Sequence, residues 1–265
     1  MEARPHIRKL KEFGQFIFPL IVAGTIWQLV VSFGFIQAAL LPAPSMIAQE
    51  FYRLIWVKQT LLHHLGCSLY RLAIGYTLAV AVGILAGALL GLNRTVREMF
   101  SPTLSLLIAV PTIAWVPVLL VTTGLGDKTV ITAIFLGGVF EMTYSTMAGI
   151  RSVNRQLINA ARVMGVTGPK LFFKVLVPAS LAMVMPTLRL SNGYCWRALI
   201  GAEMLSAMIR WGVGKMIYEA RFWNDVKIMF VGLLLIGVCA VLLDRILLKP
   251  LERGTVEKWG MLSGS

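Results

Sequence analysis

Charged residues are scarce in this chain. Only 14% of its 265 residues are charged and 57% are hydrophobic, whereas soluble domains carry roughly 25% charged and about 45–50% apolar residues. With a mean hydropathy of +0.77, this excludes an ordinary soluble globule and a disordered chain, because a hydrated shell could not cover so much apolar surface. The composition predicts a membrane protein that crosses the bilayer several times.

Cysteine and histidine are also rare. The three cysteines are Cys67, Cys195 and Cys239. Their odd number and wide spacing exclude a disulfide framework, and we expect small buried hydrophobic residues there. His63 and His64 have no cysteine or carboxylate at ligand spacing, so we expect a hydrated loop pair rather than a metal site.

Six apolar runs are long enough to cross a membrane as helices, which takes about 20 residues each. They are Phe16–Ile36, Leu72–Leu92, Thr103–Thr123, Thr129–Ile150, Ser180–Leu205 and Ile228–Leu248. The first run follows a basic start that resembles a signal peptide. Its apolar stretch is longer than that of a signal peptide and no good cleavage site follows, so we expect a retained helix.

Acidic residues number 12 against 25 basic ones, which gives a net charge of +13. In a soluble protein this balance would suggest nucleic-acid binding, but in a membrane protein Lys and Arg mark the cytoplasmic loops. If the N-terminus is cytoplasmic, the cytoplasmic segments carry fifteen of the 25 basic residues and the outer segments carry seven. The sequence therefore predicts both termini in the cytoplasm, a lipid bilayer around the chain and no nucleic-acid partner.

The spans divide the chain into four expected parts. These are a cytoplasmic N-terminal segment (1–15), a first transmembrane helix with an outer amphipathic helix (16–66), a transmembrane domain (67–250) and a cytoplasmic tail (251–265). The amphipathic helix is predicted over Pro44–Gly66 from apolar residues at helical spacing, with Ser45 as its N-cap.

Small residues and prolines mark two of the spans. Gly83, Gly87 and Gly91 lie on one helical face, which predicts the close approach of another helix. Pro111 and Pro117 free backbone carbonyls in the third span, which a membrane tolerates only where the helix is buried in protein or lines a wet path. The pattern indicates a tightly packed bundle.

The longest predicted cytoplasmic loop, residues 151–178, has a detailed pattern of its own. Asn154 is a good N-cap for a helix over Arg155–Val163, and Gly165 can take the positive φ that ends such a helix. Thr167 can cap a second short helix, Lys170–Val175, which we expect to stop at Pro178. A basic helical hairpin with a small Ala160-Ala161 centre suits insertion into the groove of a partner.

This loop resembles a known motif. Asn159-Ala160-Ala161, then Gly165, then Val175-Leu176-Val177-Pro178 is similar to the EAA loop of ABC-importer permeases, and it lies between the fourth and fifth spans as in that family. The segments that resemble the nitrate/sulfonate/taurine branch are Leu41–Ser45, Ser68–Arg71, Gly149–Val153, Leu188–Leu190 with Gly193, Trp196, Ala202-Glu203 and Leu243–Arg245. The resemblance covers about nine-tenths of the chain.

The resemblance implies an all-α membrane protein with six transmembrane helices, the type I ABC-importer permease fold and cytoplasmic coupling helices in the inner membrane. It implies a second permease copy, most simply a homodimer, two ABC ATPase subunits and an extracytoplasmic solute-binding protein. The residues that it assigns to ATPase coupling are Asn154, Arg155, Leu157, Asn159, Ala160, Ala161, Arg162, Gly165, Lys170, Lys174 and Pro178.

The chain departs from the family pattern at two positions. The motif glutamate is Asn159, which removes any contact that needs its carboxylate, and the proline usual after Phe140 is Glu141. A carboxylate in mid-span costs about 2.5–3.5 kcal/mol on insertion scales. Glu141 is therefore either a partner of Arg189 or Arg197 or a group of the translocation path. The candidate path residues are Glu141, Arg189, Arg197 and Glu203, with an arginine pair or a helix cap as the alternative role for Glu203.

Two other functions compete with an importer permease. An ion-coupled secondary transporter would favour repeated halves and several intramembrane acids, and a membrane enzyme would need a catalytic constellation; the sequence offers neither. The segment Gly124–Thr129 lacks the Gly-Lys-[Ser/Thr] ending of a P-loop, so we expect no cofactor on this chain, no enzyme activity of its own and ATP bound by a partner subunit. The resemblance implies a small, mainly anionic solute such as a sulfonate, taurine, nitrate or bicarbonate.

Overall fold

The computed structural model describes residues 5–206 and 208–255, and within them it contains helices and turns but no strand. Residues 1–4 and 256–265 of the two predicted terminal segments lie outside this description. The chain forms two compact units, one of residues 1–62 with 216–234 and the other of residues 63–215 with 235–265.

The first unit is built on α1 (Pro5–Ser32) and α2 (Pro44–Tyr52), followed by a π-helical turn, η1 (Arg53–Val57). The backbone N–H of Ser45 donates to Oε1 of Gln28 at 3.1 Å, so a side chain of α1 satisfies a free donor at the start of α2. The rings of Trp27 and Phe230 lie 5.6 Å apart within this unit.

The expected amphipathic helix over Pro44–Gly66 is wrong in two respects. Its N-cap is Ala43, not Ser45, because Pro44 takes the first helical position, for which its fixed φ is preorganised. The helical stretch also ends with η1 at Val57. Gln59, in the turn that follows, adopts a φ of 53°, and a new helix begins at Leu61.

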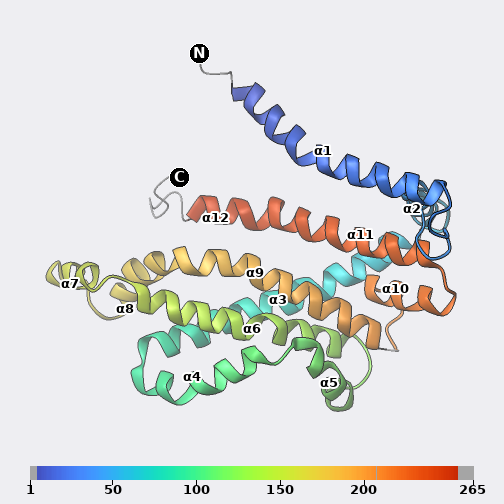
Figure 1. The fold of residues 1–265 in the computed structure, drawn as a ribbon. Coiled ribbons are helices and arrows are strands. Elements are labelled where there is room, and N and C mark those ends of the chain that lie inside the picture. The colour runs from blue at the N-terminus through green and yellow to red at the C-terminus, as the bar shows by residue number, and fades with distance from the viewer. Residues whose placement is uncertain (1–4, 207, 256–265) are drawn as a thin grey trace. The chain divides into compact units, whose positions relative to one another are not determined.

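The second unit contains most of the remaining helices (Figure 1). They are α3 (Leu61–Leu92), α4 (Arg94–Ala109), η2 (Thr112–Trp115), α5 (Val116–Thr123), α6 (Asp127–Ser152), α7 (Arg155–Val163), α8 (Gly168–Leu171), η3 (Phe172–Leu176), α9 (Val177–Leu205), α10 (Val213–Phe222), α11 (Val226–Leu243), η4 (Asp244–Leu248) and α12 (Lys249–Thr255), of which α10 and α11 each belong partly to the first unit. The helices α6 and α9 run side by side along their length.

Four helices of the described residues are long and apolar enough to cross a membrane, namely Leu61–Leu92, Asp127–Ser152, Gly168–Leu205 and Val226–Glu252. A fifth candidate is the pair α4 and η2–α5, and α1 contributes a shorter apolar stretch, Ile21–Ser32. Six spans are compatible with this set if the pair and α1 each cross once.

The third predicted span is not a straight helix. Its two halves, Arg94–Ala109 and Thr112–Thr123, meet at an angle of 93°. Val110 at the break is extended, with φ −78° and ψ 119°, because the ring of Pro111 crowds the α conformation of the residue before it. Pro117 lies in the first turn of α5, where a missing N–H costs nothing.

The glycine face predicted in the second span packs against α6. A Cβ added at Gly75 would lie 2.7 Å from the side chain of Ile134, and one at Gly87 would lie 2.5 Å from the carbonyl oxygen of Thr143. Gly83 and Gly91 meet α6 in the same way. The predicted close approach of two helices is confirmed, and it extends one glycine further than expected.

Two other boundaries differ from the prediction. The second span starts at Leu61, so His63 and His64 belong to a helix rather than a loop, and His64 is buried. The short helix after Thr167 does not stop at Pro178 but continues into α9 as one helix, Gly168–Leu205. The π-helical turn η3 directly before Pro178 widens the helix and shifts the hydrogen bonds that the proline ring would otherwise disrupt.

Candidate functional site

The loop between α6 and α9 forms a helical hairpin, which we call the α7–α8 hairpin (residues 154–171). Oδ1 of Asn154 accepts from the backbone N–H of Gln156 at 2.8 Å and caps α7 as predicted. Gly165 adopts a φ of 77°. Around it, Val166 N donates to Ala161 O and Gly165 N to Arg162 O, both at 2.9 Å. This is the Schellman arrangement that a left-handed residue allows.

The second arm of the hairpin starts at Gly168, which has a φ of 57°. Thr167 occupies the N-cap position, but its side chain makes no capping hydrogen bond. Pro169 lies in the first turn as expected. Two successive left-handed glycines therefore set the reversal of the chain between the arms, with no long-range contact needed for the turn itself.

Buried contacts hold the hairpin on one side and leave the other side bare. Ala161, Leu171 and Leu176 are buried, whereas Val163 is 89% exposed and Met164 is 75% exposed. Of the predicted coupling set, Ala161 is the buried member and Pro178 is half-buried. The exposed members are Asn154, Arg155, Leu157, Asn159, Ala160, Arg162, Gly165, Lys170 and Lys174. The hairpin, labelled α7 and α8 in Figure 1, therefore exposes both apolar and basic residues to its surroundings.

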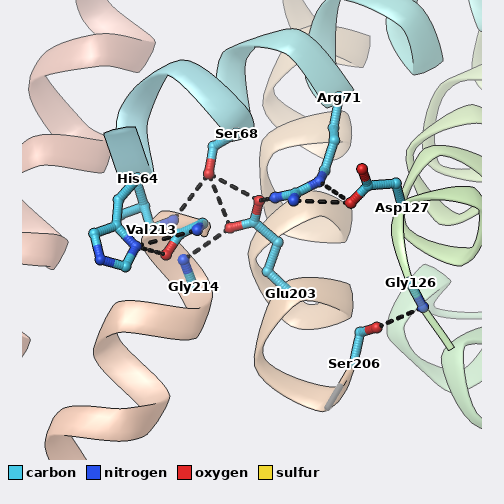
Figure 2. Close-up of polar contacts among 10 residues, drawn as sticks. His64, Ser68, Arg71, Gly126, Asp127, Glu203, Ser206, Val213 and Gly214 are labelled. Atoms are coloured by element: carbon cyan, nitrogen blue, oxygen red, sulfur yellow. Dashed lines mark hydrogen bonds and ion pairs between the residues drawn. The ribbon is translucent and has the colours of Figure 1, made fainter. Parts of the chain in front are cut away.

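A buried polar cluster lies at the opposite end of α6 and α9. We call it the Glu203 cluster (His64, Ser68, Arg71, Asp127, Glu203 and the backbone of 212–214), and Figure 2 shows its contacts. Glu203 is completely buried. Its carboxylate lies 2.6 Å from Nη1 of Arg71 and accepts from Oγ of Ser68 at 2.8 Å. Ser68 and Arg71 are three residues apart on α3, so one helical face carries both.

The backbone after α9 completes this cluster. Gly214 N–H donates to Glu203 at 2.9 Å, and Val213 N–H donates to Oγ of Ser68 at 2.9 Å. A Cβ on Gly212 would lie 2.7 Å from the carboxylate of Glu203, so only glycine fits this approach. Nδ1 of His64 lies 2.8 Å from the carbonyl oxygen of Gly212. The turn before α10 is thus tied to α3 through Glu203.

Arg71 joins this buried carboxylate to a second, more exposed one. Its Nε and Nη2 each lie 2.8 Å from Oδ1 of Asp127, the first residue of α6. The side chain of Asp127 is 57% exposed, against 4% for Arg71. The neighbouring Gly126 N–H donates to Oγ of Ser206 at 3.1 Å. Three helices, α3, α6 and α9, are therefore cross-linked at this end by charge and hydrogen bonds.

The geometry describes a transmembrane helix pair with an anchored end and an exposed basic hairpin, and the comparisons with known proteins agree with this organisation. Residues 79–249 match the family model for the binding-protein-dependent transport system inner membrane component. The chain belongs to this family. It is a permease component of a transport system and a multi-pass inner-membrane protein, which decides against the ion-coupled secondary transporter.

Three relatives are similar along most of the chain. A permease named for aliphatic sulfonate transport, SsuC of Bacillus subtilis (strain 168), is 32% identical over 92% of this chain and 86% of its own length. The bicarbonate transport system permease protein CmpB of Synechocystis sp. is 31% identical over 86% of this chain and 84% of its own. The taurine transport system permease protein TauC of Escherichia coli (strain K12) is 29% identical over 85% and 82%, respectively.

A solved structure shares the fold. A chain of the MetNI methionine ABC transporter in an inward-facing conformation superposes with a TM-score of 0.63. It has 18% identity to this chain and covers 75% of it, with 97% of its own length matched. The expected type I ABC-importer permease fold is confirmed.

The four candidate path residues of this permease do not converge on one site. Arg189 forms a two-point ion pair with Asp244 at 2.6 and 2.7 Å and reaches Glu252 at 3.0 Å. Glu203 lies 14 positions further along α9, about 21 Å away at 1.5 Å per residue. Of the two alternative roles expected for Glu203, the structure shows the pair with an arginine, and that arginine is Arg71.

The other two candidates keep their charged groups accessible. Glu141 is half-buried on α6, and the described residues contain no ion pair to it. Neither Arg189 nor Arg197 is therefore its partner. The guanidinium of Arg197 is exposed, lies 4.7 Å from the centre of the Tyr194 ring and donates from Nε to the carbonyl of Gly193 at 3.2 Å.

Several residues of these polar contacts were not singled out as site residues by the sequence reasoning. They are His64, Ser68, Arg71, Asp127, Asp244 and Glu252. One signal was present: a serine and an arginine three residues apart at the start of an apolar run place two polar groups on one face of a helix, and such groups need a partner in a membrane. No local signal indicated that the partner is 132 positions away at Glu203.

Proposed function

We propose that this permease imports a small, mainly anionic solute such as a sulfonate, taurine, nitrate or bicarbonate. Its relatives are named for aliphatic sulfonate, taurine and bicarbonate transport. In this proposal two copies enclose the path, two ATPase subunits bind them from the cytoplasm, and a solute-binding protein delivers the anion from outside. The chain itself performs no catalysis.

The orientation that we propose has both termini in the cytoplasm. The distribution of basic residues, fifteen on the predicted cytoplasmic side against seven on the other, supports it. In this orientation the α7–α8 hairpin faces the cytoplasm and the Glu203 cluster lies near the outer surface.

The observation that carries the proposal is the exposed surface of the α7–α8 hairpin. An exposed apolar patch ringed by one sign of charge is typical of a docking surface. The side chains of Val163 and Met164 are largely exposed, and the basic residues Arg155, Arg162 and Lys174 of the same loop are exposed as well. The Asn154 cap and the two left-handed glycines fix the shape of the hairpin locally. A rigid element can pass the movement of an ATPase subunit directly to α6 and α9.

Within the translocation path we assign roles to Glu141 and Arg197. Both charged groups are accessible and free of ion pairs among the described residues, whereas those of Arg189 and Glu203 are neutralised by carboxylates or by Arg71. An arginine with an aromatic neighbour suits an organic anion. Glu141 would repel anions that carry no positive group and would favour a zwitterion such as taurine.

Transport by the complete complex tests the proposal. The permease, its cognate ATPase and the cognate binding protein are reconstituted in vesicles with ATP on the ATPase side. Radiolabelled taurine, an alkanesulfonate, nitrate and bicarbonate are then offered with the binding protein. We expect ATP-dependent accumulation of at least one of these four solutes, and none without the binding protein. Accumulation only of solutes that carry no anionic group, or transport without an ATPase, would contradict the proposal.

A further inference from the structure

A cavity of about 620 Å³ opens beside the exposed side of the Glu203 cluster. Its walls come from α3, from the turn between α5 and α6, and from the segment after α9, all within one compact unit. Arg71 and Asp127 form part of the wall, so the cavity lies against the ion pair of the cluster. The transport mechanism proposed above assigns no role to this space.

The charges that line the cavity favour an anion. Lys128 and Arg210 are exposed in its wall, and the described residues include no carboxylate in an ion pair with either of them. Arg71 forms ion pairs with both Glu203 and Asp127. The three cations (Lys128, Arg210 and Arg71) therefore exceed the two carboxylates by one positive charge. Lys128 also lies in the first turn of α6, a 26-residue helix whose N-terminal end carries partial positive charge.

The rest of the lining is apolar or aromatic. Leu125, Met208 and Ile209 contribute to the walls, together with the ring of Trp211, over which the guanidinium of Arg210 lies at 5.6 Å from the ring centre. Cationic groups beside an apolar wall bind an anion that also has a hydrocarbon part more tightly than they bind an inorganic ion.

Asp127 already occupies the anion position next to Arg71. Its Oδ1 accepts from both Nε and Nη2 of the guanidinium, its side chain is 57% exposed and it lines the cavity, whereas Glu203, the other carboxylate bound to Arg71, is inaccessible. Of the two carboxylates that Arg71 holds, Asp127 is the one that an entering anion can replace.

We infer that this cavity binds an organic anion with a short apolar tail, whose head group contacts Lys128, Arg210 and the outer edge of Arg71 in competition with Asp127. The inference rests on the proposed function for its choice of ligand class, since a sulfonate or carboxylate solute has this chemistry. A phospholipid head group has it as well, and the test separates these two sources.

The test measures binding to the purified permease–ATPase complex in nanodiscs of phosphatidylcholine, without the binding protein. Isothermal titration with hexane-1-sulfonate is expected to show saturable binding that hexan-1-ol does not reproduce. Replacing Lys128 and Arg210 together by alanine should weaken this binding at least tenfold, and Asp127→Asn should strengthen it several-fold. Trp211→Ala should weaken hexane-1-sulfonate but leave methanesulfonate unchanged.

The matched control removes the same amount of charge at the other end of α3. Alanine at Arg94 and Arg97, neither of which lines the cavity, should leave the binding unchanged. Equal binding by the Lys128/Arg210 variant and the unmodified complex, equal losses in both double variants, or no saturable binding at all would overturn the inference.

Two further arms complete the design. In nanodiscs that contain phosphatidylglycerol, weaker binding of hexane-1-sulfonate identifies a lipid head group as a competing occupant of the same site, and unchanged binding identifies the soluble anion alone. Anion uptake is measured on the same preparations. Uptake without hexane-1-sulfonate binding overturns this site and leaves the proposed function standing, whereas binding at the site without uptake of any anion overturns the proposed function alone.

Discussion

The two ends of the α6–α9 pair are stabilised in opposite ways. At one end the Glu203 cluster joins residues far apart in the sequence, with a completely buried carboxylate and an arginine whose side chain is 4% exposed. At the other end, about 39 Å away along α6, the α7–α8 hairpin depends on the Asn154 cap and two left-handed glycines and leaves Val163 and Met164 exposed. The first end is complete within this chain, whereas the second presents a surface that a partner can cover.

Because of this difference, we expect the Glu203 cluster to determine the stability of the fold and the hairpin to determine the coupling to the ATPase. Buried ion pairs are costly to break, because the partner left behind is an uncompensated charge. Exposed basic and apolar side chains contribute little to folding and remain available for binding. We therefore expect changes in the Glu203 cluster to reduce the amount of folded protein, and changes in the hairpin to alter what the folded protein does.

The largest effect is expected from Arg71→Ala. The substitution leaves Glu203 buried without its cation, which costs about 3–5 kcal/mol of folding free energy. The thermal unfolding temperature and the yield of the complex in the membrane should both fall sharply.

Two controls test the cause of that loss. Exchanging Arg71 and Glu203 together for uncharged residues, Met and Gln, should recover part of the stability because the carboxylate that loses its partner, Asp127, is 57% exposed and no buried charge is left alone. Arg94→Ala removes one partner of the exposed pair with Glu98 and should leave stability unchanged. An Arg71→Ala variant as stable as the unmodified protein would remove the distinction between the two ends.

The next effect is expected at Gly165 in the hairpin. Its φ of 77° permits the chain to reverse direction between the two arms of the hairpin. A β-branched residue cannot adopt this positive φ without strain. Gly165→Val should separate ATP hydrolysis from transport, so that ATPase activity continues while uptake drops at least tenfold at normal expression. Gly165→Asn, which tolerates positive φ, should retain most of the uptake. Normal uptake by the valine variant would count against the coupling role.

A smaller effect is expected from the basic ring of the hairpin. Replacing Arg155, Arg162 and Lys174 together by alanine should weaken the association with the ATPase subunits several-fold, because charge complementarity affects docking. Co-purification at rising salt concentration measures the effect. The same number of charges removed at Lys128, Arg210 and Lys227 should not change co-purification, and an equal loss there would show that general charge, not the hairpin, holds the ATPase.

The smallest effect is expected from Glu141→Gln, midway between the two ends. If Glu141 lines the path, the variant should assemble normally and change its relative uptake of taurine and an unsubstituted alkanesulfonate a few-fold. Loss of the complex from the membrane would instead indicate a structural carboxylate. Glu98→Gln, on the exposed Arg94 pair, is the control for removing an acid.

The features that could be predicted from the sequence are those with local causes. Asn154 caps α7 through a contact two residues away, and Gly165 ends it with bonds that span only the last turn. The glycines of α3 were recognisable from their four-residue spacing. The long apolar runs became helices for the same reason, since hydrophobic length is read directly from the chain.

The features that could not be predicted depend on partners far away in the sequence, or on positions where two local preferences, such as a proline and a capping residue, compete. Glu203 meets Ser68 and Arg71 across more than 130 positions, and nothing in their spacing identifies the pair. Pro111 follows an extended residue at the end of a helix, whereas the helices continue through Pro102, Pro178 and Pro186, so a proline in the sequence does not by itself decide where a helix ends. Ser45 was outcompeted as a cap by Pro44, whose ring fixes the first helical residue.

The glycine contacts between α3 and α6 also restrict how this permease can move. They extend from Gly75 to Gly91, about 24 Å of helix, and with backbones so close a shift of one helix along the other would drive larger side chains into the spaces that the glycines leave. Sliding is therefore disfavoured, and these two helices should turn together as a single lever. The point about which they turn must then lie outside this contact. A candidate is the 93° bend between α4 and α5, because the helix is already interrupted there and no continuous helix has to bend.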